Sequence, residues 1–209
     1  DAVDNKQWTA LMFAAHGGHE QCALALIKAG AALEKVNKDS FTALMISCQN
    51  GLEQCALELL KAGAAVDATE EDGWTALMFA ALNNHEQCLR ALLEAGADVN
   101  KPGPQGYSYL MVACQNGHEQ CALALIKAGG DLEKQEHQGM TALLWACTNG
   151  HEQCALALIK AGANVNATDE ADWTTLMHAC QNGHEQCALA LLKAGANANA
   201  ANQRGSTAL

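Results

Sequence analysis

The stretch TALMFAAHGGHEQCALALIKAGA, from Thr9 to Ala31, determines the fold because variants of it recur along the whole chain. Each copy is introduced by one residue of what we call the opening row, and these residues stand 33 positions apart: Trp8, Phe41, Trp74, Tyr107, Met140 and Trp173. A fixed period of this length is typical of arrays in which each copy buries its apolar face against its neighbours. The sequence therefore predicts a repeat array instead of a compact globular domain.

Each copy contains the signals for two short helices. In the first copy, Thr9 is a natural N-cap for a helix over residues 10–16. A second helix is predicted over residues 19–28, and Gly30 suits the left-handed position that follows a helix. The polar residues 31–40 predict a projecting loop or hairpin. Neither helix is long enough to be stable alone, so stacking of the copies must stabilise both.

This pattern resembles the ankyrin repeat family, whose copies are 33 residues long and pair two antiparallel helices with a projecting β-hairpin. The resemblance implies an all-α ankyrin repeat solenoid. Two departures from the family motif T-P-L-H recur here as T-A-L-M. In the first copy, Ala10 replaces the proline and Met12 replaces the histidine. We expect the hydrogen bond between the threonine and that histidine to be lost, with apolar packing in its place.

The period also predicts the domain organisation. Residues 1–7 align with the end of a copy, and residues 206–209 open a further, incomplete one. We expect the chain to be part of a longer array. The six full copies are residues 8–40, 41–73, 74–106, 107–139, 140–172 and 173–205.

Composition and charge narrow the classes of partner. The formal net charge is −11, which repels phosphate backbones and anionic lipid headgroups. No apolar run approaches the ~20 residues that span a bilayer. We therefore expect no nucleic-acid and no membrane partner. The acidic loops at residues 69–72 and 169–172 favour a protein partner of basic character, although charged loop tips are more often simply solvated.

The cysteines follow the repeat and not a disulfide framework, because their spacing is that of the copies and no CxxC occurs. Small apolar alanines replace them in some copies, which predicts buried free thiols. Unpaired thiols in this number indicate a reducing compartment, and we expect a cytoplasmic protein. One row is Cys22, Cys55, Cys88, Cys121, Cys154 and Cys187, and the other is Cys48, Cys114, Cys147 and Cys180.

The sequence predicts neither a metal site nor a catalytic site. His19 and Cys22 stand three residues apart, and four other copies repeat this pair. A zinc site needs three or four converging ligands, and successive pairs lie one copy apart. We interpret the pair as a structural histidine beside a buried cysteine. No nucleophile, base and orienting group occur together, so we expect neither a cofactor, nor a metal, nor an enzyme.

The candidate binding residues come from comparing the copies. The second helix is nearly constant, whereas the opening row, the loops and one position of the first helix all vary. We call the residues at that position the inner row: Phe13, Ile46, Phe79, Val112, Trp145 and His178. The resemblance implies that both rows face a shared concave groove, and core packing is the alternative. Including Tyr109, which follows an N-cap, the predicted partner-binding residues are Trp8, Phe13, Phe41, Ile46, Trp74, Phe79, Tyr107, Tyr109, Val112, Met140, Trp145, Trp173 and His178.

The sequence thus predicts a non-catalytic module that binds a protein or peptide through an aromatic-lined concave groove and hairpin tips. A structural spacer or an engineered repeat scaffold without a specific partner is the alternative. A leucine row on the second helices is also expected to face solvent, because Arg90 replaces leucine in one copy. The sequence does not decide whether the chain self-associates, either end to end or laterally. That row is Leu24, Leu57, Arg90, Leu123, Leu156 and Leu189.

Overall fold

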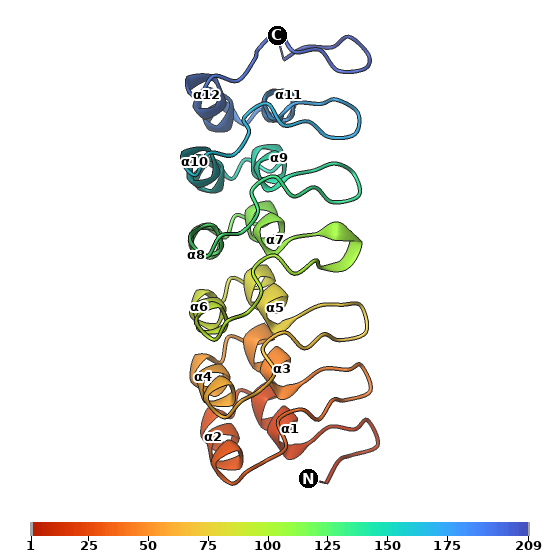
Figure 1. The fold of residues 1–209 in the computed structure, drawn as a ribbon, viewed down its shortest axis with the longest axis vertical. Coiled ribbons are helices and arrows are strands. Elements are labelled where there is room, and N and C mark those ends of the chain that lie inside the picture. Colours follow the sequence, from red (N-terminus) through yellow and green to blue (C-terminus); the bar gives the residue numbers. More distant parts are fainter. Residues whose placement is uncertain (1, 209) are drawn as a thin grey trace. The chain divides into compact units, whose positions relative to one another are not determined.

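A computed structural model describes residues 2–208 as an all-helical protein (Figure 1). Within these residues there are twelve α-helices and one short 3-10 helix, and extended pairing is limited to isolated β-bridges. The projecting loops therefore resemble hairpins but contain no strand. The chain forms two compact units, Asp1–Val99 and Asn100–Leu209, each with three helix pairs.

In the first unit, the first helices of the copies form one row and the second helices form another. Helices α1, α3 and α5 pack side by side, as do α2, α4 and α6, and each first helix packs on the second helix of its own copy. The long loops project from the side of the first helices (Figure 1). The bounds are α1 (Ala10–His16), α2 (Glu20–Lys28), α3 (Ala43–Gln49), α4 (Glu53–Lys61), α5 (Ala76–Leu82) and α6 (Glu86–Glu94).

The second unit repeats this two-row arrangement, with α7, α9 and α11 in one row and α8, α10 and α12 in the other. Its first loop differs, because the two prolines of the chain lie there and Pro104–Gly106 forms the 3-10 helix η1. The bounds are α7 (Tyr109–Gln115), α8 (Glu119–Lys127), α9 (Ala142–Thr148), α10 (Glu152–Lys160), α11 (Thr175–Gln181) and α12 (Glu185–Lys193).

The helix ends follow the predicted signals closely. Helix α1 has the predicted bounds, and the Thr9 hydroxyl accepts a hydrogen bond from the Met12 N–H at 3.2 Å. Helix α2 starts one residue later than predicted, because His19 is its N-cap and makes no capping bond with its side chain. Gly30 has a φ of +82°, the left-handed conformation that the sequence indicated.

The methionine that replaces the family histidine does more than pack. The backbone N–H of Thr42 donates to the Met45 sulfur at 3.5 Å, and that of Ser108 donates to the Met111 sulfur at 3.4 Å. The prediction of purely apolar replacement is therefore wrong in these two copies. Thioether sulfur is a weak acceptor, but here it accepts from a helix-end N–H that would otherwise be buried without a hydrogen-bond partner.

The core consists of the apolar residues of the first helices and the small residues between the rows. Leu44, Met45, Leu77 and Met78 are all at most 2% exposed. Eight of the ten cysteines are buried and free, as predicted. The Cys88 thiol beside Cys48, together with burial, raises the pKa of Cys48 well above its ordinary value, so this thiol stays protonated and unreactive.

Cys22 and Cys180 are exposed, against the prediction of burial. Their positions in the array explain the difference. The equivalents of Cys180 contact a cysteine on the second helix of the following copy, as Cys147 does with Cys187. Cys180 lies in the sixth copy and Cys22 in the first, so each has a described helix pair on one side only.

Three of the recurring histidines join their copy to the preceding one, which supports their interpretation as structural residues. The His184 Nε2 atom lies 3.0 Å from the carbonyl oxygen of Thr148, at the end of the preceding first helix. His85 and His151 contact the equivalent carbonyls at 3.1 Å. Each ring lies against a glycine, and a Cβ on Gly150 would stand only 2.4 Å from the His184 Nδ1 atom. We call these contacts the histidine seam: His85, His151 and His184 over Gly51, Gly117 and Gly150.

A second set of bonds between copies starts from polar side chains after the second helices. Each side-chain oxygen accepts from a backbone N–H in the next copy, at 2.7–3.3 Å. These bonds hold the copies in register. The acceptors are Glu34, Asp67, Asn100, Glu133 and Asn166, and the donors are Ala65, Asp98, Asp131, Asn164 and Asn197.

Candidate binding face at the loops and first helices

All but one of the loops are closed by an oxygen-bearing side chain four residues before the residue that opens the next copy. The Glu70 Oε1 atom accepts from the backbone N–H of Trp74 at 2.7 Å and from that of Asp72 at 3.0 Å. The chain bends back on itself at this point and presents the opening side chain in a fixed orientation. The equivalent acceptors elsewhere are Asp4, Asn37, Glu136, Asp169 and Asn202.

Sequence analysis missed these loop-closing residues, although a signal was present. An Asp, Asn or Glu occurs every 33 residues, with Gly103 as the exception. In that copy the 3-10 helix η1 closes the loop instead, and the Gly103 N–H donates to the carbonyl of Tyr107 at 2.9 Å. The residue just before each opening position is left-handed, whether glycine, as at Gly73, or not, as at Ser40 (φ +63°).

The structure divides the thirteen predicted binding residues by exposure. Phe13 is 52% exposed, and the other seven that reach the surface are half-buried. We call these eight residues and the closed loops beside them the loop face. The half-buried seven are Trp8, Phe41, Trp74, Tyr107, Trp145, Trp173 and His178.

Five of the predicted residues are buried, which corrects the expectation that both rows face solvent throughout. Tyr109 is only 1% exposed, because it takes a position whose equivalents Ala43, Ala76 and Ala142 are also buried. Variation among the copies at these positions reflects repacking of the core and not exposure. The buried five are Ile46, Phe79, Tyr109, Val112 and Met140.

Ring contacts connect the loop face within the first unit. The rings of Trp8 and Phe13 lie 5.2 Å apart, and Trp8 also meets His16 edge-on at 5.3 Å. In the next group, Phe79 of α5 contacts Phe41 at 5.1 Å and Trp74 at 5.4 Å. Phe79 is 7% exposed, so it supports from beneath two rings that remain partly open to solvent.

An open cavity of about 470 Å³ lies at this second group, and we call it the acid–aromatic pocket. Its wall combines apolar side chains with carboxylates, and it contains no basic side chain. This combination differs from the mostly apolar lining of an ordinary ligand pocket. Its lining residues are Asp39, Phe41, Glu70, Glu71, Asp72, Trp74, Phe79 and Leu82.

The equivalent positions in the second unit form two different groups. Tyr107 and Trp145 lie 6.1 Å apart in a near-parallel arrangement, and Trp145 packs on a core cluster that contains Met140 and Leu144. The buried indole N–H of Trp145 has no hydrogen-bond partner. Burial raises the pKa of the Tyr107 phenol, with a further contribution from the carboxylate of Glu136.

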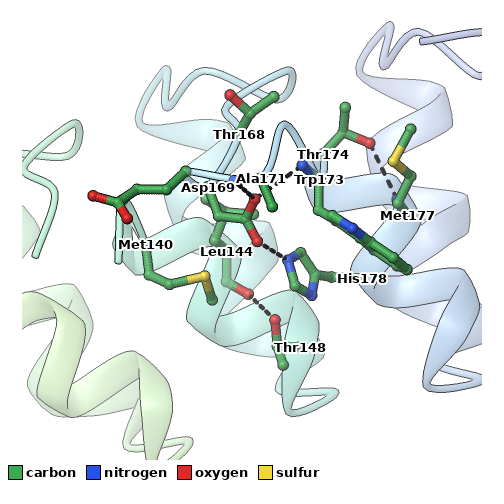
Figure 2. Close-up of polar contacts among 12 residues, drawn as sticks. Met140, Leu144, Thr148, Thr168, Asp169, Ala171, Trp173, Thr174, Met177 and His178 are labelled. Atoms are coloured by element: carbon green, nitrogen blue, oxygen red, sulfur yellow. Dashed lines mark hydrogen bonds and ion pairs between the residues drawn. The ribbon is translucent and has the colours of Figure 1, made fainter. Parts of the chain in front are cut away.

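The second group links loop and helix through a histidine–aspartate pair (Figure 2). The His178 Nε2 atom lies 3.0 Å from the Asp169 Oδ2 atom, and the His178 ring lies 5.6 Å from that of Trp173. The Oδ1 atom of Asp169 meanwhile accepts from the backbone N–H groups of Ala171 and Trp173, both at 2.9 Å. Both oxygens of Asp169 are therefore engaged, one by the backbone of its own loop and one by the first helix that follows.

The leucine row on the second helices is partly exposed, as predicted. Leu123, Leu156 and Leu189 are 38–41% exposed, and the Arg90 side chain pairs with Glu86 at 2.7 Å. Leu24 and Leu57 are half-buried. No group of three or more His, Cys, Asp or Glu side chains suited to a metal ion occurs among residues 2–208.

The fold and the loop face define a class: a helical repeat protein whose copies present variable side chains on a constant framework. Comparison with known proteins identifies the family within this class. The family model described as ankyrin repeats (3 copies) matches residues 1–70, 58–136 and 110–202. The chain belongs to the ankyrin repeat family.

Solved structures agree with this assignment. The chain is similar to the human ASB11 ankyrin repeat domain, with 28% identity and a TM-score of 0.88 over 96% of this chain and 90% of that one. It is also similar to the ankyrin repeat domain of Bcl-3, a member of the IkappaB family, with 25% identity and a TM-score of 0.86 over 98% and 93%. No curated protein matches the chain. None of the helices described is long and apolar enough to cross a membrane.

Proposed function

We propose that this chain is a non-catalytic module that binds a protein or peptide partner through its loop face. Ankyrin repeat domains are generally protein–protein interaction modules, typically without catalytic activity. The observation that carries the proposal is the exposure of large aromatic residues that contact one another beside closed loops, led by Phe13 and Trp8. Trp and Tyr are enriched at interaction hot spots, and a fixed surface loses little entropy on binding.

The net charge of −11 and the acidic loops favour a partner of basic character over a nucleic acid or an anionic membrane. The ten free thiols suit a reducing compartment, and we propose a cytoplasmic location. The exposed leucines of the second helices offer a separate surface for lateral self-association of two chains. Two chains could also associate end to end.

The test compares two faces of the same protein. The chain is immobilised as wild type, as Phe13→Ser, and as Leu156→Ser, which removes an equally apolar side chain from the opposite row. We expect Phe13→Ser to weaken the binding free energy of captured proteins by ~2 kcal/mol, as for a hot-spot residue, so that they are lost from the support. Leu156→Ser should retain them. If all three variants capture the same proteins, the loop face is not the binding site. If none captures any protein above a blank support, the spacer or scaffold alternative is favoured.

A further inference from the structure

We propose that the acid–aromatic pocket binds an arginine side chain of a protein or peptide partner. The inference rests on the proposed function, because it assigns the chemistry of one anchoring site within the loop face. The pocket lies entirely in the first unit, between the loop that ends at Phe41 and the loop that ends at Trp74.

The floor of the pocket is formed by three rings, of which Phe79 contacts the other two. Phe79 is tilted by 37° from Phe41 and lies within 26° of parallel to Trp74. Phe79 is buried and fixed by α5, whereas Phe41 and Trp74 are half-buried and line the cavity. The face of an aromatic ring attracts a cation, most strongly at tryptophan, and a planar guanidinium can also stack on it.

The rim supplies negative charge. Asp39, Glu71 and Asp72 are exposed, and their carboxylates form no recorded hydrogen bond or ion pair within residues 2–208. The Oε1 atom of Glu70 already closes its loop. No lysine or arginine lines the cavity, so the four carboxylates are not neutralised by a neighbouring basic side chain. The charge of this wall is complementary to a cation.

A guanidinium fits this combination better than an ammonium. It offers flat faces to the rings and a fork of N–H donors that matches a carboxylate through two parallel hydrogen bonds. Lysine provides a compact, strongly hydrated charge that uses neither feature fully. The cavity of about 470 Å³ has room for one such side chain together with water.

The equivalent positions elsewhere lack one half of the chemistry. The loop before Tyr107 has the sequence KPGPQG and contains no carboxylate. In the sixth copy, His178 takes the place of Phe79, and the loop carboxylate of Asp169 binds that histidine. Phe79 with Glu71 and Asp72 is thus a combination that these two copies do not reproduce.

The direct test uses three capped pentapeptides with arginine, lysine or neutral citrulline between glycines. Each is titrated into the full ¹⁵N-labelled chain while the four tryptophan indole N–H signals are followed, with the Trp74 signal assigned from Trp74→Phe. We expect the arginine peptide to shift the Trp74 signal and the other two to bind at least about fivefold more weakly. Equal shifts with citrulline would overturn the proposal, as would equal binding of lysine or no shift at Trp74.

Charge variants provide the matched comparison. Glu71→Gln with Asp72→Asn should weaken binding of the arginine peptide about tenfold, since two charge-assisted contacts become neutral. Glu170→Gln with Asp172→Asn makes the same change in net charge in the loop of another copy and should leave the affinity within about twofold. All four positions are exposed, so both variants should fold, and thermal unfolding verifies this. If both pairs of substitutions weaken binding of the arginine peptide equally, the effect comes from net charge alone and the proposed arginine site is overturned.

The inference can fail separately from the proposed function. If Phe13→Ser abolishes partner capture while the Glu71/Asp72 variant captures partners normally and binds the arginine peptide unchanged, the loop face remains the binding site and the arginine pocket is overturned. If the arginine peptide binds at Trp74 but neither Phe13→Ser nor the Glu71/Asp72 variant affects partner capture, the pocket binds arginine and the proposal that the loop face binds the protein partner fails.

Discussion

The histidine seam and the loop face occur in the same copies but differ in what those copies keep constant. In the seam, His85, His151 and His184 each contact a carbonyl and a glycine of the preceding copy, and across the six copies these positions depart from histidine and glycine only at Leu52 and Asn84. On the loop face, the loop-closing residue and the ring beneath it change from copy to copy. Glu70 and Phe79, on either side of Trp74 in the sequence, become Asp169 and His178, on either side of Trp173.

The difference follows from where the partner atoms lie. A seam contact places a histidine ring against a left-handed glycine of the preceding copy, so a side chain added at that glycine disrupts the packing. Loop closure requires any side-chain oxygen at the correct distance from the opening N–H, which Asp, Asn and Glu all provide. The loop face can therefore vary without loss of the fold, and that freedom permits specificity for a partner.

The largest expected effect comes from filling the seam. Gly150→Ala adds a Cβ that would stand 2.4 Å from the His184 Nδ1 atom, at a φ of +74°. We expect a loss of about 2–4 kcal/mol, which combines the left-handed backbone penalty with overpacking. Urea unfolding of the full chain, followed by circular dichroism, measures it.

Gly183→Ala is the matched control. Gly183 has a φ of +71°, but a Cβ there would meet nothing within 4 Å. Only the backbone penalty of about 1 kcal/mol should remain. If the two alanine variants are equally destabilised, the histidine ring adds nothing to the cost and the seam does not constrain the residue at position 150.

The second prediction concerns the closure of a loop. Asp169→Ala removes the acceptor for the backbone N–H groups of Ala171 and Trp173 as well as the partner of His178. We expect a loss of about 1–2 kcal/mol, because the three donors can turn partly to solvent. Asp169→Asn keeps the Oδ1 acceptor and should lose less than about half of that. Unfolding midpoints of the two variants measure the difference, and an equal loss would show that charge and not loop closure is the main contribution.

Much of the fold could be predicted from the sequence because its signals are local and repeated. The N-cap at Thr9, the end of the helix near Gly17 and the left-handed Gly30 each act within one helical turn, and six copies confirm one another. The burial of Cys48 and the structural role of His184 followed from comparing copies. These features depend on neighbours whose sequence is known once the period is known.

The candidate site was less accessible from sequence because exposure depends on atoms in neighbouring copies. Phe13 and Phe79 occupy the same position of the repeat, yet Phe13 is 52% and Phe79 7% exposed. Phe79 contacts the rings of both Phe41 and Trp74, whereas among the aromatic rings of residues 2–208 Phe13 contacts that of Trp8 alone. Periodicity identifies equivalent positions, but it does not report which of them a neighbouring ring will cover.

A smaller, stabilising effect is expected where a loop tolerates an unfavourable residue. Ser40 precedes Phe41 with a φ of +63°, in a position that glycine occupies before Trp74 and Met140. Ser40→Gly should stabilise the chain by about 0.5–1 kcal/mol, because glycine has no Cβ to strain this conformation. Lys38→Gly in the same loop is the control, since Lys38 does not have a positive φ and should lose stability through added chain entropy. A loss of stability with Ser40→Gly would mean that the loop is not held as described.

The smallest expected effect tests whether the loop face accepts a different ring. Trp145→Phe removes an indole N–H that is buried without a hydrogen-bond partner, while it keeps a ring against Tyr107. The relief of that unsatisfied donor, worth about 1–3 kcal/mol, should offset most of the lost apolar contact, so the net change should stay within about 0.5 kcal/mol. Trp145→Ala loses the ring as well and should cost about 2–3 kcal/mol, because the cluster of Met140 and Leu144 loses its cover. If the phenylalanine variant is as unstable as the alanine variant, the fold requires the indole ring of Trp145. Trp145 would then be constrained by stability, as the seam residues are, and would not be free to vary for a partner.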